Sequence, residues 1–169
     1  CRKEISPKYP NFHFQSADIY NKEYNPKGKY KASEYKFPYK DESFDFVFLT
    51  SVFTHTLPND MENYFSEIAR VLKRGGRCLA TFFLLNTESL KLVDAKLSTI
   101  DLKYGDGEYC TISKSNPEHI IAYDEKFVRK LYEKYKQNIV EPIRYGSWCG
   151  RENFLSYQDI IIAVKKTGE

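Results

Sequence analysis

This sequence of 169 residues contains only eight glycines, four cysteines and three histidines. None of its eight glycines precedes Gly28, so no glycine-rich turn between a strand and a helix occurs before that residue. Its three histidines lie far apart, which predicts that the chain has no metal site. The four cysteines include no CxxC pair, so no disulfide framework is expected, and this usage is typical of a reducing, cytoplasmic protein.

Long apolar runs and a strong excess of one charge are also missing. No run approaches the roughly 18 apolar residues of a membrane span, and no signal-peptide pattern is visible. Lysine and arginine total 26 against 23 acidic residues, and the net charge of +3 does not call for a nucleic-acid partner. The length and the 41% of hydrophobic residues indicate one globular domain with a substantial core.

Residues 37–86 have the pattern of a βαβ unit. The apolar run at 44–49 is rich in β-formers and is typical of a strand covered on both faces. Apolar residues then recur at helical spacing over 61–72, and residues 78–85 are the next expected buried strand. Parallel α/β sheets bind ligands at the carboxyl ends of their strands, so a site is expected there.

The expected helix of this unit has recognisable end signals. Asn59 is the predicted N-cap, with Glu62 three residues later in a capping-box-like spacing. Lys73 and Arg74 suit the C-terminal turn, and the pair Gly75-Gly76 suits the left-handed turn that ends a helix.

Four pieces of the unit resemble the middle of a class I S-adenosylmethionine-dependent methyltransferase of the type 11/25-like group. They are Phe37-Pro38 ahead of Asp41, SFD at 43–45, TSVFTH at 50–55 and EIARVLKRGG at 67–76. The resemblance implies an enzyme with a Rossmann-like α/β sheet of order 3-2-1-4-5-7-6, whose last strand is antiparallel. In that family the first strand precedes a glycine-rich loop and the second ends in an acid, and neither is recognisable here. We therefore interpret residues 1–169 as a single domain, the C-terminal portion of a methyltransferase domain, with an incomplete sheet that holds strands 3 to 7.

The remaining elements follow from local patterns. Three further strands are predicted, at residues 12–17, 139–145 and 158–166. Thr87 and Asp124 are expected to cap two helices, and Gly105-Asp106-Gly107 is expected to turn a hairpin. In the family, the region after the fifth strand often covers the substrate, so residues 87–124 are interpreted as such an insertion.

The resemblance implies S-adenosylmethionine as the cofactor and places it at the strand ends. Asp18 is expected to accept a hydrogen bond from the adenine amino group, for which a carboxylate is well suited, and the amide of Ile19 is expected at a ring nitrogen. Thr50, Ser51 and Val52 are expected to line the methionine and adenosine side.

The methyl acceptor is expected beside the same strand ends. His55 is a candidate general base, with anchoring of its loop as the alternative interpretation. Five further residues are predicted to contact the acceptor: Phe53, Phe83, Asn86, Trp148 and Tyr157. Core packing is the alternative for Phe83 or its neighbour Phe82, because consecutive strand residues point to opposite faces.

Methyl transfer to a small molecule is the leading interpretation, and three alternatives stay open. Residues 21–39 interleave lysines with tyrosines, which is compatible with an RNA methyltransferase or an RNA-binding module, although a solvated loop is favoured. A nicotinamide-dependent Rossmann-like enzyme fits the expected antiparallel last strand less well. A non-catalytic fragment without cofactor is the third alternative.

Overall fold

The computed structural model describes residues 2–168 and shows two β-sheets of four strands each. The larger sheet has the order β1-β2-β8-β7 and contains β1 (Phe44–Leu49), β2 (Leu72–Phe82), β8 (Asp159–Lys165) and β7 (Gln137–Ile139). The smaller sheet has the order β3-β6-β5-β4 and contains β3 (Leu84–Leu85), β6 (Ile121–Asp124), β5 (Tyr109–Thr111) and β4 (Tyr104–Gly105). The α-helices are α1 (Pro58–Val71), α2 (Thr87–Asp94) and α3 (Glu125–Lys134), and short 3-10 helices span Phe53–His55 and Pro117–His119.

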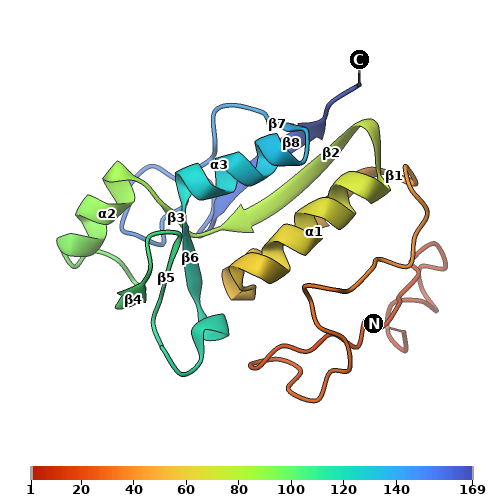
Figure 1. Ribbon diagram of the computed structural model, residues 1–169, viewed down its shortest axis with the longest axis horizontal. Coiled ribbons are helices and arrows are strands. Elements are labelled where there is room, and N and C mark those ends of the chain that lie inside the picture. The colour runs from red at the N-terminus through yellow and green to blue at the C-terminus, as the bar shows by residue number, and fades with distance from the viewer. Residues whose placement is uncertain (1, 169) are drawn as a thin grey trace.

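The larger sheet has the predicted topology. Strands β1 and β2 are parallel, and β8 is antiparallel to both of its neighbours, β2 and β7. Helix α1 connects β1 to β2, and α1 and α3 lie on the same face of the sheet (Figure 1). This arrangement is the order fourth, fifth, seventh and sixth strand with an antiparallel seventh, so the Rossmann-like α/β prediction is confirmed for these four strands.

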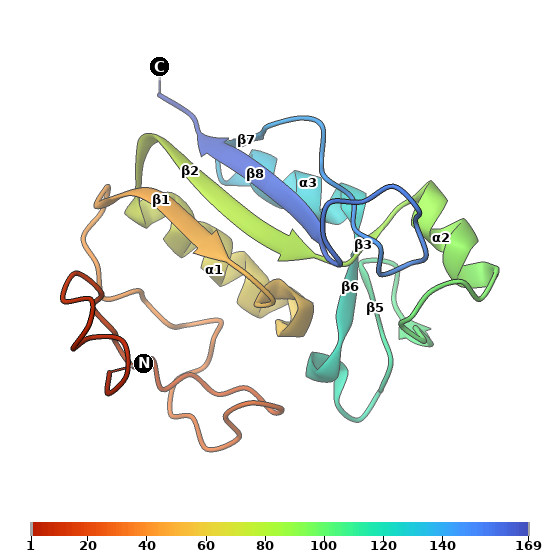
Figure 2. The same ribbon diagram turned by 180° about the vertical axis from the view of Figure 1, so that it is seen from behind.

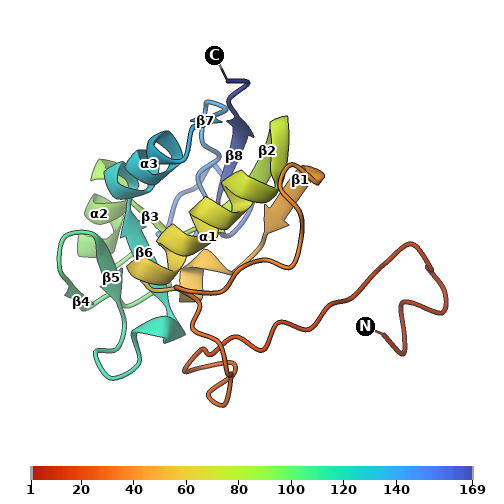
Figure 3. The ribbon, with the colours of Figure 1, turned by 45° about the vertical axis from the view of Figure 1, so that its right-hand side comes forward.

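Residues 12–17 do not form the predicted third strand. Phe12 is 58% exposed, and the first pairing along the chain is an isolated bridge between Ile19 and Tyr30. Figure 3 shows this N-terminal segment reaching away from the sheet. An alternating pattern becomes a strand only where a neighbouring strand satisfies its backbone groups, and no strand among residues 2–168 lies beside this segment.

Two other predicted strands have different bounds. Residues 78–85 divide at Phe83, because β2 ends at Phe82 while Leu84 and Leu85 pair with β6 of the smaller sheet. The predicted strand at 139–145 is mostly loop, since β7 ends at Ile139 and only an isolated bridge joins Arg144 to Ile160. The hairpin of β4 and β5 around Gly107, and the strand predicted at 158–166, are confirmed.

The helix ends partly correct the sequence prediction. Helix α1 starts at Pro58 after Leu57, which makes no side-chain cap, so Asn59 is not its N-cap. The N-cap of α2 is Asn86 rather than Thr87, and its side chain accepts from the amide of Ser89. Asp124 caps α3 as predicted.

The C-terminal end of α1 also differs from the prediction. Lys73 and Arg74 lie in β2, because the helix ends at Val71 and the chain enters the strand at once. Gly75 has the expected left-handed backbone, with φ of 74°, but inside that strand rather than in a turn between the two elements.

Strand β1 is covered on one face only, which corrects the expectation of burial on both. Phe46 and Phe48 are 51% and 66% exposed and stack with ring centroids 6.2 Å apart. Helices α1 and α3 lie behind the sheet in Figure 2, and β1 forms its outer edge. The described residues therefore leave an apolar strip along an unpaired strand edge.

The core consists of two clusters. The larger lies between the main sheet and the helices α1 and α3, and includes the stacked rings of Phe53, Phe65 and Phe82. The smaller packs around Trp148 and includes Phe83 and Ile100. Within residues 2–168, no helix combines the length and apolar character needed to cross a bilayer.

Candidate functional site

A turn at Ser51 follows β1 and contacts the carboxyl end of β2. Ser51 has a left-handed backbone with φ of 55°. Its amide donates to the Thr81 hydroxyl of β2 at 2.8 Å, and its own hydroxyl donates to Gln158 Oε1 at 3.2 Å. Because Gln158 immediately precedes β8, these contacts hold the turn where the ends of three strands meet.

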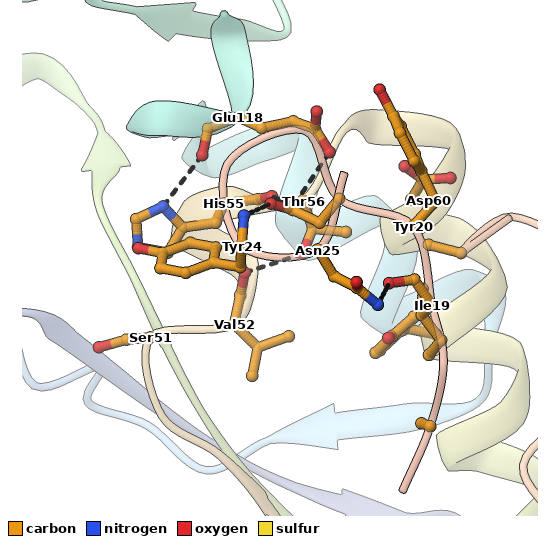
Figure 4. A pocket seen from close by; sticks show the side chains of 14 residues that line it. Ile19, Tyr20, Tyr24, Asn25, Ser51, Val52, His55, Thr56, Asp60 and Glu118 are labelled. Atoms are coloured by element: carbon orange, nitrogen blue, oxygen red, sulfur yellow. Dashed lines mark hydrogen bonds between the residues drawn. The ribbon is translucent and has the colours of Figure 1, made fainter. Parts of the chain in front are cut away.

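A cavity of about 370 Å³ lies between this turn and the loop that follows residue 17 (Figure 4). It is open to solvent on one side, and most of its lining is apolar or aromatic. Fourteen residues line it: Ala17, Ile19, Tyr20, Asn21, Tyr24, Asn25, Ala32, Ser51, Val52, His55, Thr56, Asp60, Tyr64 and Glu118. The structure thus brings together four of the predicted site residues, namely Ile19, Ser51, Val52 and His55.

Asn21 ties the loop to the strand-end turn. Its side-chain amide donates to the carbonyl of His55 at 3.0 Å and to Glu118 Oε1 at 2.9 Å. Its side-chain oxygen accepts from the amides of Glu23 and Tyr24 at 3.0 and 2.9 Å. One side chain therefore shapes the loop and fixes it against two other segments.

His55 is held by both of its ring nitrogens. Nδ1 lies 3.0 Å from the carbonyl oxygen of Glu118, and Nε2 lies 3.2 Å from the hydroxyl of Tyr24 (Figure 4). A carbonyl oxygen only accepts, so Nδ1 carries the proton. In the neutral ring Nε2 is then an acceptor, and the Tyr24 hydroxyl donates to it.

Two carboxylates lie on the cavity wall. Glu118 is 7% exposed, and burial raises the pKa of its carboxyl, against the opposing effect of the hydrogen bond from the Lys22 amide. Burial also raises the pKa of Asp60, against hydrogen bonds from Ser33. Perturbed acids in a cavity are typical of functional sites, although structural networks perturb acids too.

Two of the predicted cofactor residues lie outside the cavity lining. Asp18 is half-buried, its Oδ1 accepts from the Asn25 side chain at 3.2 Å, and its carbonyl accepts from the amides of Lys29 and Tyr30. Thr50 is exposed at the end of β1. The role of Asp18 at the adenine therefore stays a prediction, and its observed contacts shape the loop.

The five predicted acceptor residues do not line this cavity. Phe53, Phe83 and Trp148 are at most 4% exposed and belong to the core clusters, so each has a packing role. Asn86 caps α2 and donates to Glu125. Tyr157 is 46% exposed, and its hydroxyl lies 2.9 Å from that of Thr99.

Sequence reasoning missed three cavity residues that organise the site. Asn21 and Tyr24 lie in the lysine- and tyrosine-rich loop, where composition drew attention to nucleic acid instead. Glu118 lies 63 residues after His55 in the 3-10 helix Pro117–His119. No local pattern signals a contact of that sequence separation.

Comparison with known proteins agrees with the topology. The family described as "Methyltransferase domain" matches residues 11–80. This chain has the class I methyltransferase fold, and residues 11–80 are similar to that family in sequence. The segment contains β1, α1 and most of β2, together with the residues of the strand-end turn.

Three solved structures share the fold. A SAM-dependent methyltransferase from Methanosarcina mazei is 20% identical, with 83% of this chain and 69% of that chain covered and a TM-score of 0.53. A protein from Pyrococcus horikoshii OT3 is 18% identical, with coverages of 80% and 57% and a TM-score of 0.51. An O-methyltransferase family 2 protein from Planctomyces limnophilus, solved in complex with apigenin, is 15% identical, with coverages of 80% and 33% and a TM-score of 0.50. The chain thus spans from a third to about two thirds of the length of these proteins.

Proposed function

We propose that the protein transfers the methyl group of S-adenosylmethionine to a small-molecule acceptor. One observation carries the proposal: Ile19, Ser51, Val52 and His55 line one cavity at the carboxyl end of β1. Ligands of open α/β sheets bind in the crevice at that end of the strands. The family match and the fold support methyl transfer as the reaction class.

Methyl transfer from a sulfonium needs positioning above all. The acceptor atom, the methyl carbon and the sulfur must lie in line, and such alignment contributes about 7–11 kcal/mol to lowering a barrier. In this proposal the Ile19 amide and Asp18 hold the adenine side, and the turn at Ser51 and Val52 holds the methionine side. The bonds of Ser51 to Thr81 and Gln158 stiffen that turn before any ligand arrives.

The cavity favours a small acceptor over RNA. Its largely apolar lining suits an organic acceptor held beside the cofactor. The alternative of RNA rests on the loop at 21–39, where Tyr30 is 56% exposed. Two of its lysines have partners within the chain, because Lys22 bonds to the carbonyl of Ser115 and Lys31 pairs with Glu34.

A matched pair of substitutions tests the cofactor site. Val52→Arg places a long cation in the cavity wall, whereas Val140→Arg makes the same change at a 39% exposed position after β7. Calorimetry is expected to show that Val52→Arg binds S-adenosylmethionine at least tenfold more weakly than the wild type, a loss of about 1.4 kcal/mol. The affinity of Val140→Arg should be unchanged. Thermal melting identifies loss of fold, and Ile19→Arg provides a second cavity variant.

Equal affinity in the folded cavity variants and the wild type would overturn the proposed cofactor position. For the acceptor, binding of RNA oligonucleotides is measured at several salt concentrations. Affinity that falls steeply with salt, as expected where lysines neutralise phosphates, would favour the RNA alternative. Methylation of small hydroxyl or amine compounds, followed by mass spectrometry, would support the small-molecule acceptor.

A further inference from the structure

The contacts around His55 point to the chemical class of the methyl acceptor. We propose that Tyr24 and His55 together take a proton from the acceptor, which is therefore a hydroxyl or N–H compound. Glu118 and Asn21 are positioning residues for this pair. The inference rests on the proposed function and deepens it by assigning proton removal to named atoms.

The first support is the orientation of the imidazole. The carbonyl of Glu118 accepts from Nδ1, which leaves the Nε2 lone pair directed at the Tyr24 hydroxyl. The two rings are close to perpendicular, at 80°, with centroids 5.0 Å apart. Nδ1 thus anchors the loop, while Nε2 faces a group that lines the cavity.

The second support is the double role of Glu118. Its main-chain carbonyl binds the His55 ring, while its buried carboxylate accepts from the Asn21 side chain at 2.9 Å and from the Lys22 amide at 3.0 Å. Asn21 in turn accepts from the Tyr24 amide at 2.9 Å. The residue that orients the base therefore also holds the segment carrying the tyrosine.

The third support is access. Tyr24 is 67% exposed although its hydroxyl is bonded to His55, so solvent or a ligand in the open cavity reaches the phenol. His55 itself is only partly exposed. A proton leaving the acceptor therefore reaches the imidazole most directly through the Tyr24 hydroxyl.

The surroundings suit a ring that becomes a cation. Acidic groups face the site from α1, through Asp60, and from the 3-10 helix Pro117–His119, through Glu118. The adjoining basic side chains have partners: Lys22 binds the Ser115 carbonyl, and His119 lies 3.1 Å from Glu23 Oε1. The acid on which the charge of His55 acts is Glu23, whose pKa is lowered by hydrogen bonds from His119 and Asn116 and further by His55.

The proton transfers balance as follows. The acceptor gives its proton to the Tyr24 oxygen as Tyr24 gives its own proton to Nε2, so His55 becomes an imidazolium and Tyr24 is regenerated. The lone pair on the acceptor oxygen or nitrogen forms the bond to the methyl carbon. Bound S-adenosylmethionine would supply that methyl carbon and would keep the electron pair of the broken carbon–sulfur bond on its sulfur. The imidazolium later loses its proton to water.

Nitrogen-15 NMR of the imidazoles in the full chain gives a readout that needs no turnover. We expect neutral His55 to be the tautomer protonated at Nδ1, with the signal assigned by its loss in His55→Asn. A tautomer protonated at Nε2 would overturn the inference, because that nitrogen would have no lone pair for a proton.

Tyr24→Phe is the kinetic test, and Tyr30→Phe is its matched control on the same loop, since the Tyr30 ring does not line the cavity. We expect Tyr24→Phe to lower kcat roughly 100-fold, as is typical for loss of acid–base catalysis, with S-adenosylmethionine affinity unchanged. Tyr30→Phe should behave as the wild type. An unchanged kcat in Tyr24→Phe would overturn the proton pathway. A wild-type chain that does not bind S-adenosylmethionine would instead overturn the proposed function.

Glu118→Gln tests the positioning role. It keeps the carbonyl that sets the His55 tautomer but presents an NH₂ group to either the Asn21 amide or the Lys22 amide, both of which are donors. We expect the tautomer to persist while the nuclear Overhauser contact between the Tyr24 and His55 rings weakens and kcat falls. Persistence of that contact with a normal kcat would show that Glu118 does not position the pair.

Discussion

The indole nitrogen of Trp148 donates to the buried carboxylate of Asp159 at 2.8 Å, and both residues are fully buried. The same carboxylate accepts from the amides of Leu84 and Gly146, each at 2.6 Å, and from Arg151 at 3.3 Å. Leu84 begins β3 of the smaller sheet, while Asp159 begins β8 of the larger one. Asp159 therefore joins the two sheets through a buried hydrogen-bond network, with Trp148 as one of its donors.

Trp148→Ala is expected to destabilise the fold by about 3–5 kcal/mol, the cost of removing a large aromatic side chain from a core. Trp148→Phe keeps a ring but removes one of the two donors to Asp159 Oδ2, so it is expected to cost about 1 kcal/mol. Phe154→Ala, at a 57% exposed position of the same loop, is the control and should change little. Urea unfolding measures all three. A fully stable Trp148→Ala variant with altered acceptor kinetics would support the sequence-based prediction that Trp148 contacts the acceptor.

The ion pair of Glu67 and Arg70 is expected to make the fold less stable at acidic pH. Glu67 accepts from the Arg70 guanidinium at 2.7 and 2.8 Å and from the Phe37 amide, and the hydrogen bonds from Arg70 lower the pKa of its carboxyl. A carboxyl with a lowered pKa stabilises the fold above its unfolded pKa of about 4.5. That contribution is lost as the pH falls from there through the lower pKa of the folded state.

Glu67→Gln should therefore be less stable than the wild type at neutral pH by about 1–3 kcal/mol. The difference should shrink as the pH falls below about 4.5. Urea unfolding at a series of pH values measures both trends. Glu34→Gln, whose ion pair with Lys31 is exposed, is the control. A difference between Glu67→Gln and wild type that is independent of pH would show that the carboxylate charge does not stabilise the fold.

Asp18→Ala is expected to weaken S-adenosylmethionine binding by about 1–3 kcal/mol if the carboxylate serves the adenine amino group. Asp18 also accepts from Asn25, which donates to the Ile19 carbonyl at 2.9 Å. Asn25→Ala removes that loop contact while retaining the Asp18 carboxylate, so it separates the two effects. Calorimetry showing equal losses for both variants would assign Asp18 to the loop rather than to the cofactor.

The exposed strip of Phe46 and Phe48 on the edge strand β1 is expected to promote self-association of residues 1–169, because unpaired apolar edges template further pairing. Phe48→Lys should reduce concentration-dependent light scattering with little change in melting temperature. Phe154→Lys adds the same charge at an exposed position outside the sheet. Equal improvement by both substitutions would mean that net charge, rather than the β1 edge, controls association.

Local patterns in the sequence were sufficient for the unit of β1, α1 and β2 and for β8. The apolar periodicity of each of these elements lies within the element itself, so it can be recognised from the local sequence. The crossover connection through α1 makes β1 and β2 parallel. The cap at Asp124 was predictable for the same reason, because it satisfies amides only a few residues away. The rule that ligands bind at strand ends led to the expectation that Ser51, Val52 and His55 lie at a site, and all three line the cavity, but the turn at Ser51 was not predicted.

Tertiary structure alone decided the features that depend on distant partners. Residues 12–17 alternate like a strand, but pairing needs a neighbour that the pattern does not specify. The predicted strand at 78–85 divides at Phe83 because its first part pairs with β8 and its last two residues pair with β6. Trp148 packs in a core cluster where Asp159 accepts from its indole, and His55 is oriented by a carbonyl 63 residues away. By itself the sequence determined which segments become regular elements, since those hydrogen bonds and apolar faces are local, whereas packing between elements decided which side chains meet at the site.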